Sequence, residues 1–216
     1  MRQVSLSLAR PRLRRVRAVL RFVASVMMVS GTLLIADAAV TLLWQEPISA
    51  YVAGKNQGTL KKAFFDPPER VIDRRPLKGD AIAEIMIPSI GLSKYVVEGT
   101  DVDSLRKGPG HYPDTPLPGE PGTAAIAGHR TTYGAPFRHI DEVQRGEPVI
   151  IDMPDGRFVY RVQRTKVVDD QDLSVLDRVG YQRLVLSACH PLYSAAQRII
   201  VFARLIRREA ARVRRG

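Results

Sequence analysis

The feature that most constrains this chain is an apolar run near its start. Residues 22–44 are 23 consecutive positions in which Asp37 is the only charged side chain. A helix needs about 20 apolar residues to cross a bilayer, so the run predicts a transmembrane anchor. Six arginines between positions 10 and 21 precede it. Positive charge on that side predicts a cytoplasmic N-terminus, with the rest of the chain outside the membrane.

A cleaved signal peptide is the alternative interpretation. Residues 22–36 would form its apolar core, and Ala36-Asp37-Ala38 fits a small-residue cleavage site. A carboxylate at the bilayer centre costs about 2.5–3.5 kcal/mol on insertion scales, although Asp37 lies toward the outer end. We favour the anchor because apolar residues resume through Leu43. Both interpretations place the remainder outside the cytoplasm, and the anchor predicts a single-pass protein of the cell membrane.

The net charge of +11 is concentrated at the two ends of the chain. Residues 1–21 hold seven arginines and no acid, and residues 204–216 hold six arginines and one glutamate. Thirteen of the 33 basic residues therefore lie in these ends, which leaves 20 basic and 21 acidic residues between them. A nearly neutral middle excludes the basic face that nucleic-acid binding requires.

These patterns divide the chain into five parts. The parts are a cytoplasmic basic tail (1–21), the anchor (22–44), a membrane-proximal linker (45–80), a folded domain (81–206) and a basic C-terminal tail (207–216). Within the linker, Gly54 and Gly58 weaken a possible membrane-proximal helix, and prolines between 67 and 76 interrupt regular structure.

The folded domain is predicted to be mostly β. Short apolar or β-branched runs lie at 82–88, 95–97, 123–128, 148–152, 157–162, 164–168, 184–188 and 198–205. Asp155-Gly156 predicts a hairpin turn, and Asp101 and Asp172 predict N-caps of single helical turns. Short strands at this spacing are typical of a barrel or a sandwich.

The last two predicted strands carry the chain's only cysteine and an arginine. Cys189 ends one strand, a short loop follows, and Arg198 begins the next strand. Antiparallel strands joined in this way bring Cys189 and Arg198 side by side at one rim of the sheet. A thiol beside a fixed cation favours the thiolate and can hold an oxyanion. A buried, unreactive cysteine is the simpler alternative.

Four histidines could accompany the thiol: His111, His129, His139 and His190. His129 follows a glycine at the end of a small-residue strand, a place from which a side chain can reach a cleft. His111 lies in a Gly- and Pro-rich loop, where Tyr112 either lines a groove or packs on the next proline. Spacing alone does not choose among the four.

Two long segments resemble the sortases, the membrane-anchored cysteine transpeptidases of Gram-positive bacteria. The segments 127–137 and 189–198 are most similar to class E sortases of actinobacteria. The resemblance implies a closed eight-stranded β-barrel with short helices, with Cys189 as nucleophile, His129 as general acid/base and Arg198 as oxyanion-stabilising residue. Candidate substrate-binding residues are Tyr112, His111, Ala188 and Tyr133. The family pattern before the cysteine has two threonines, at the positions of Val185 and Ala188.

The resemblance also implies the reaction and the partners. A sorting signal similar to Leu-Ala-x-Thr-Gly or Leu-Pro-x-Thr-Gly is cleaved between Thr and Gly through a cysteine thioester. The acyl group of the secreted protein then passes to an amine of a peptidoglycan precursor or a pilin. We expect no cofactor and no metal. The alternatives are a non-catalytic anchored β-module and an L,D-type transpeptidase, although the latter's Ser-His-Gly-Cys pattern does not fit Ser187-Ala188-Cys189.

Overall fold

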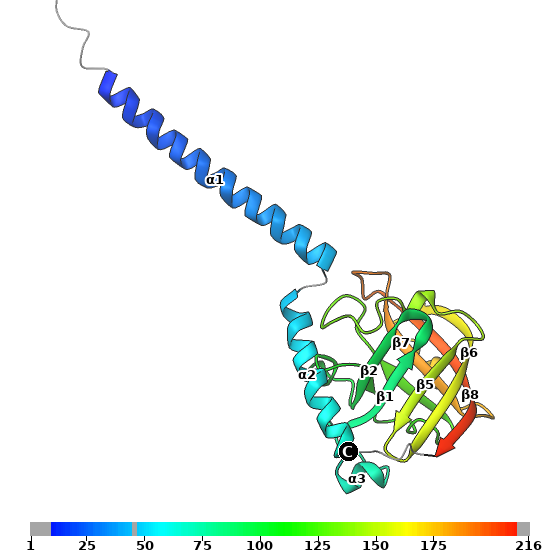
Figure 1. Ribbon diagram of the computed structural model, residues 1–216. Helices are drawn as coiled ribbons and strands as arrows, with labels where there is room; N and C mark the ends of the chain where they lie inside the picture. The colour runs from blue at the N-terminus through cyan, green and yellow to red at the C-terminus, as the bar shows by residue number, and fades with distance from the viewer. Residues whose placement is uncertain (1–9, 45–46, 211–216) are drawn as a thin grey trace, which may run out of the picture. The chain divides into compact units, whose positions relative to one another are not determined.

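The computed structural model describes residues 10–44 and 47–210. Contacts divide the chain into two compact units, residues 1–44 and 45–216. The first unit contains helix α1 (Arg10–Trp44) (Figure 1). By length and composition, its segment Arg14–Val40 could cross a membrane. An apolar helix therefore lies where the sequence predicts the anchor, while residues 1–9 of the predicted tail lie outside the described residues.

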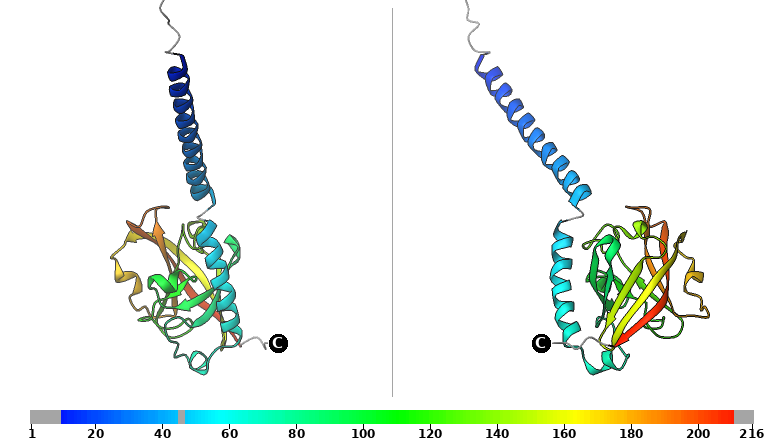
Figure 2. Two further views of the ribbon diagram at one scale, coloured as in Figure 1. Left: turned by 90° about the vertical axis from the view of Figure 1, so that its left-hand side faces the viewer. Right: turned by 45° about the vertical axis from the view of Figure 1, so that its right-hand side comes forward.

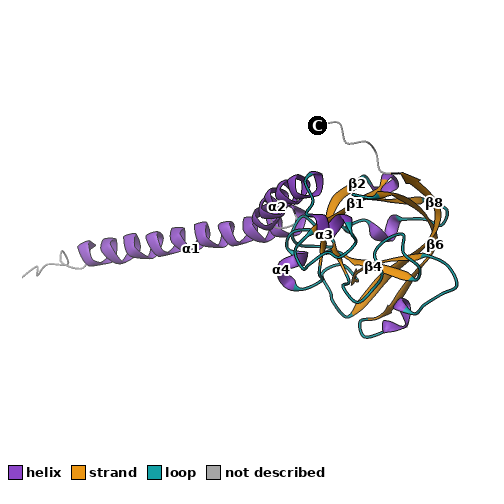
Figure 3. Ribbon diagram, turned by 90° about the horizontal axis from the view of Figure 1, so that it is seen from below, coloured by secondary structure: helices purple, strands orange, loops and turns teal. Residues whose placement is uncertain are grey.

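The second unit is built around a closed barrel (Figures 1 and 3). Its strands are β1 (Ala81–Ile87), β2 (Leu92–Glu98), β3 (Gly110–His111), β4 (Thr123–Ala127), β5 (Pro148–Met153), β6 (Gly156–Asp169), β7 (Arg183–His190) and β8 (Gln197–Ala210). They follow the spatial order β1-β2-β3-β4-β7-β8-β6-β5, and β5 pairs with β1 to close the barrel. The predicted closed eight-stranded barrel is confirmed.

Short helices precede or connect the strands. They are α3 (Glu69–Ile72), α4 (Val102–Leu105), η1 (Pro88–Ile90), η2 (Ile140–Glu142) and η3 (Leu173–Leu176). Asp101 accepts hydrogen bonds from the amides of Asp103 and Ser104 at the start of α4. Asp172 accepts one from the amide of Ser174 at the start of η3. Both predicted capping residues thus satisfy backbone donors that a helix start leaves unpaired.

The barrel interior is apolar, and a second Gly- and Pro-rich loop, residues 116–122, packs against it. Tyr160 of β6 is fully buried, and its hydroxyl oxygen accepts a hydrogen bond of 2.7 Å from the amide of Gly119. Burial raises the pKa of Tyr160 to about 12. Gly119 has a φ of +87°, and a Cβ there would overlap the Phe158 ring. The loop therefore requires glycine where it meets the barrel.

Helix α2 (Pro47–Phe65) packs along the barrel, beside β1 and β2 (Figure 2). Leu60 and Phe64 are buried in one apolar cluster with Ala81 and Val97. The sequence predicts a linker for this segment, with a helix as a possibility within it. Burial of an apolar stripe stabilises the helix and outweighs the low helix propensity of its two glycines.

The C-terminal strand is longer than predicted. Strand β8 continues to Ala210, so it includes the first residues of the predicted tail, and residues 211–216 lie outside the described residues. The guanidinium of Arg208 donates a hydrogen bond to the carbonyl of Gly119 and lies 5.7 Å from the centre of the Phe158 ring. This end of β8 therefore belongs to the barrel.

Candidate active site

Strands β7 and β8 bring the cysteine and the arginine together. Cys189 and Arg198 are register partners in the antiparallel pair, which confirms their predicted placement at one end of the sheet. Ala188 and Ile199 lie in the cluster that fills the barrel. Side chains alternate between the two faces of a strand, so Cys189 and Arg198 both lie on the outer face. The thiol of Cys189 is free and half-buried.

His129 reaches the same level of the barrel from a neighbouring strand. Strand β4 runs parallel to β7, with Ala127 opposite Ser187. The amide of Gly128 continues this pairing with a 3.0 Å hydrogen bond to the carbonyl of Ser187. Two residues beyond the last pair, His129 just after the end of β4 therefore lies level with Cys189, which is still within β7. Burial lowers the pKa of His129, which favours the neutral imidazole near pH 7.

Close packing after β4 holds the backbone that precedes His129. The Phe137 ring lies over Gly128, where an added Cβ would be 2.5 Å from the ring. The amide of Phe137 also donates a 3.0 Å hydrogen bond to the carbonyl of His129. The glycine therefore allows the loop to fold back against the strand end.

The guanidinium of Arg198 is held by its own loop. Its Nη1 donates hydrogen bonds to the carbonyls of Ala195, at 2.7 Å, and Gln197, at 2.9 Å. Its Nη2 lies 4.0 Å from a carboxylate oxygen of Asp170, and 29% of the side chain is exposed. A cation with remaining exposure beside Cys189 is available to an incoming anionic group.

A pocket lies beside Arg198 on this outer face. Its lining combines Tyr112 with residues from β6, β7, β8 and η3. Val168, Val185 and Ile200 form its apolar floor, and they belong to a buried cluster with Ala125 and Phe202. Carboxylates of Asp169, Asp170 and Asp172 lie at the same pocket. The pocket therefore presents an apolar surface next to the guanidinium of Arg198 and the strand that carries Cys189.

The four candidate substrate-binding residues occupy different places. Tyr112 lines the pocket beside Arg198. Contrary to expectation, Ala188 is 3% exposed and faces the barrel core. His111 is 1% exposed, with Nδ1 2.9 Å from Glu98 and Nε2 3.1 Å from the carbonyl of Pro116. Neither of these two side chains is open to a peptide, because one packs in the core and the other has both ring nitrogens engaged.

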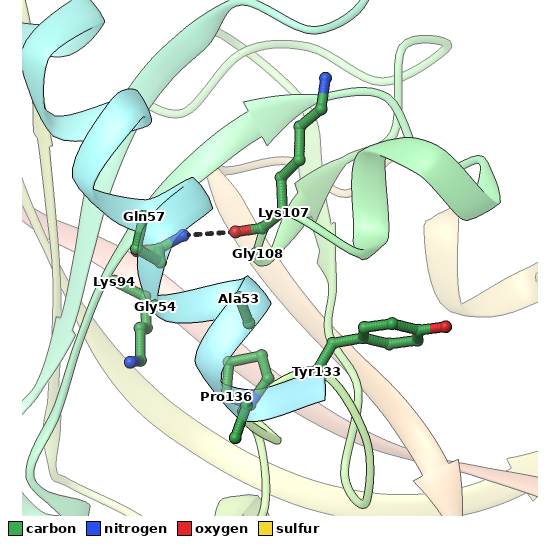
Figure 4. Close-up of a pocket in the computed structure, with 10 residues that line it drawn as sticks. Ala53, Gly54, Gln57, Lys94, Lys107, Gly108, Tyr133 and Pro136 are labelled. Carbon is green, nitrogen blue, oxygen red and sulfur yellow. Dashed lines mark hydrogen bonds between the residues drawn. The ribbon is translucent and has the colours of Figure 1, made fainter. Parts of the chain in front are cut away.

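Tyr133 lies beside His129 and not in the pocket of Arg198. The two ring centres are 5.1 Å apart. The Tyr133 hydroxyl accepts a hydrogen bond from Nε of Arg106, and its amide donates to the hydroxyl of Ser49 at the start of α2. Figure 4 shows its ring extending away from α2, with Pro136 close to its backbone. Tyr133 therefore links α2 to the loop of His129.

Two features of the site are absent from the sequence prediction. Arg130 is 2% exposed and contacts the backbone of Cys189, and α2 contacts the loop that follows His129. An arginine is usually solvated, so its residue type gives no sign of burial. Among the described residues 10–44 and 47–210, no group of three side chains suited to a metal ion occurs.

The fold and this rim define a class of protein: a closed β-barrel that carries a free cysteine opposite an arginine, with a histidine after the neighbouring strand. The sortase domain family matches residues 85–206. The chain belongs to the sortase family, a family of cysteine transpeptidases.

Curated relatives carry the names of several sortase classes, among them D and E. "Sortase D" of Bacillus subtilis is 34% identical over 136 residues, 61% of this chain and 67% of that protein. "Sortase SrtE1" of Streptomyces coelicolor is 29% identical over 144 residues, 59% of this chain. The match spans 41% of the Streptomyces protein, so this chain covers less than half of that relative's length.

Solved structures named as class D and class E also match, alongside others of the family. A Clostridium perfringens sortase D5 transpeptidase matches with a TM-score of 0.63 and 30% identity, over 73% of this chain and 99% of that one. Sortase E from Streptomyces avermitilis matches with a TM-score of 0.58 and 33% identity, over 62% of this chain and 93% of that one. The family is therefore shown, while class D and class E names both occur among the relatives.

Proposed function

We propose that this chain is a membrane-anchored sortase of the class E type, in which Cys189, His129 and Arg198 carry out acyl transfer. The single observation that supports this most is the pairing of Cys189 with Arg198 on the outer face of β7 and β8. A cysteine nucleophile needs a cation or base nearby to form its thiolate. In a member of the sortase family, this pair is the natural reaction centre.

The first half of the reaction forms a thioester. The thiolate of Cys189 attacks the carbonyl carbon of the Thr-Gly peptide bond in the sorting signal. The carbonyl oxygen becomes an oxyanion, which the guanidinium of Arg198 stabilises. His129 in its protonated form gives a proton to the glycine nitrogen as the C–N bond breaks. The glycine-containing fragment leaves as a free amine, and the acyl group stays on sulfur.

The second half transfers the acyl group. An amine of a peptidoglycan precursor or a pilin attacks the thioester carbonyl and loses a proton to His129. The C–S bond then breaks, and Cys189 leaves as the thiolate that began the cycle. The lowered pKa of His129 makes proton release to the departing amine easier and uptake from the incoming one harder. Exclusion of water favours the amine over hydrolysis.

The pocket beside Arg198 is the proposed place of the sorting signal. Its apolar floor suits the leucine of a Leu-Ala-x-Thr-Gly or Leu-Pro-x-Thr-Gly signal, and Tyr112 lies at its edge. The alanine at position 188 replaces the family's threonine in the core and not in this pocket. Ala188 therefore changes the packing beneath the cysteine, whereas Val185, at the position of the other family threonine, lines the pocket itself.

Helix α1 is the proposed single membrane span, with the N-terminus in the cytoplasm and the barrel outside. The proposed partners are secreted proteins that carry a C-terminal sorting signal. The alternative function is a non-catalytic anchored module.

A peptide-library experiment tests the proposal. The full chain in detergent micelles is incubated with peptides that vary around Leu-Ala-x-Thr-Gly, together with triglycine as the amine. We expect cleavage after threonine, a ligated product, and loss of both in Cys189→Ala, while the variant keeps the native melting temperature. Absence of cleavage and ligation across the library would support the non-catalytic alternative.

A further inference from the structure

Arg130 is a buried cation at the end of the proposed active site. It directly follows His129 in the chain, and only 2% of its side chain is exposed. Its Nε is also buried and has no hydrogen-bond partner among the described residues. Removing a guanidinium from water is costly unless several partners hold it. A buried arginine at this position therefore needs several hydrogen-bond or ion-pair partners.

The guanidinium joins three segments of chain. Its Nη2 forms an ion pair of 2.8 Å with Asp141 of η2 and lies 3.4 Å from the carbonyl of Arg138. Its Nη1 lies 3.4 Å from the carbonyl oxygen of Cys189 and 3.3 Å from Nδ1 of His190. One side chain thus connects the loop of His129, the helix η2 and the end of strand β7.

The contact with His190 fixes the state of that ring. A guanidinium only donates hydrogen bonds, so Nδ1 of His190 must accept. The tautomer that fits this contact carries its proton on Nε2. The tautomer of this residue beside the nucleophile can be observed by spectroscopy without any substrate.

We propose that Arg130 is a positioning residue, which locks the loop of His129 to the backbone of Cys189 and holds His190 in its Nε2–H form. The inference rests on the proposed function for its effect on turnover. Strands β4 and β7 are parallel neighbours, but their last register pair is Ala127 with Ser187. Beyond that pair, Arg130 continues the connection between the two segments that carry the imidazole and the thiol.

The test compares three substitutions with a matched control in the full chain. Arg130→Met removes the cation, Arg130→Lys keeps a charge without the planar fork, and Asp141→Asn weakens the ion pair. Arg157→Met is the control, because Arg157 is also largely buried (13% exposed) and paired with an aspartate, Asp152, but lies on the β5–β6 hairpin.

Turnover is the first measurement. A misplaced catalytic group lowers the rate by up to about 100-fold, so we expect kcat for peptide cleavage to fall about 10- to 100-fold in Arg130→Met with little change in KM. The kcat of Arg130→Lys should recover only part of this loss. The kcat of Asp141→Asn should lie between those of Arg130→Met and Arg130→Lys. Arg157→Met should lower the melting temperature and leave kcat unchanged.

The nitrogen NMR spectrum of His190 is the second measurement, and it requires no activity. In the native chain we expect an unprotonated Nδ1 and a protonated Nε2, assigned by comparison with His190→Gln. In Arg130→Met this preference should be lost, while Arg157→Met should keep it. An unchanged His190 spectrum in Arg130→Met would overturn the proposal, as would a native kcat in a folded Arg130→Met protein. If the native chain itself never turns over, the proposed function fails, and the spectrum still decides the role of Arg130.

Discussion

The docking of α2 on the barrel gives the most direct energetic prediction. The side-chain amide of Gln57 pairs with the backbone of Tyr95 as a neighbouring strand would. Its Oε1 accepts a hydrogen bond from the amide of Tyr95 at 2.7 Å. Its Nε2 donates hydrogen bonds to the carbonyls of Tyr95, at 3.0 Å, and Lys107, at 2.9 Å. Figure 4 shows Gln57 beside Lys107 at this contact. Gln57→Ala removes all three hydrogen bonds at once.

The expected loss follows from these contacts. Each hydrogen bond contributes about 1 kcal/mol net, and a part-buried partner left unpaired adds to the cost. We therefore expect Gln57→Ala to lower the free energy of unfolding by about 2–3 kcal/mol. In a unit of this size, each kcal/mol lost from the free energy of unfolding lowers the melting temperature by about 2–4 °C. The melting temperature of Gln57→Ala should therefore fall by about 5–10 °C.

A neighbouring residue provides the control. Asn56 is the preceding residue of α2, and its side chain makes one long bond of 3.5 Å to the carbonyl of Arg106. Asn56→Ala should change stability by less than about 0.5 kcal/mol. Both variants are measured as full chains in the same detergent by thermal unfolding. Equal melting temperatures for Gln57→Ala and Asn56→Ala would refute the view that Gln57 fastens α2 to the barrel.

Three further predictions concern the active site. Arg198→Lys should lower kcat about 100- to 1,000-fold in the peptide-cleavage assay, because a point charge does not replace the planar donor pair; native kcat would contradict this role. Burial lowers the pKa of His129, so the unfolded chain binds its proton more readily and the native state should lose stability as the pH falls below about 6.5. His129→Gln should remove that contribution in melting curves across pH, and an unchanged pH dependence would contradict it. Gly128→Ala should reduce both stability and kcat, because its Cβ would lie 2.5 Å from the Phe137 ring, whereas Gly180→Ala has nothing within 4 Å and should be close to neutral; equal effects of the two would contradict the packing argument.

Local pattern was sufficient to predict the pairing at the centre of the site. Two apolar runs joined by a short loop force antiparallel neighbours, so Cys189 and Arg198 could be placed opposite each other from spacing alone. The closed barrel topology was predicted from the resemblance to the family. The alternation of apolar and polar residues predicts strands but not their order in the sheet. Likewise, the choice of His129 among four histidines came from resemblance and not from the residues themselves.

The features that the sequence did not predict depend on contacts between residues far apart in the chain. Nothing near Gln57 in the sequence indicates that its amide pairs with Tyr95, 38 residues away. The same holds for His111, which the sequence places in an open loop and the structure buries against Glu98. Arg130 was missed because a buried arginine and a solvated one look alike until Asp141 and the carbonyl of Cys189 are brought beside it.

The central claim is that Cys189 forms a covalent thioester with the threonine of a sorting signal. Intact-mass spectrometry of the full chain, quenched during reaction with a Leu-Ala-x-Thr-Gly peptide, tests it most directly because Cys189 is the only cysteine in the sequence. We predict an adduct equal in mass to the peptide acyl group through threonine, absent in Cys189→Ala and released by an added amine. Cleavage of the peptide by Cys189→Ala, or cleavage by the native chain through water alone with no adduct under any quench, would contradict the account.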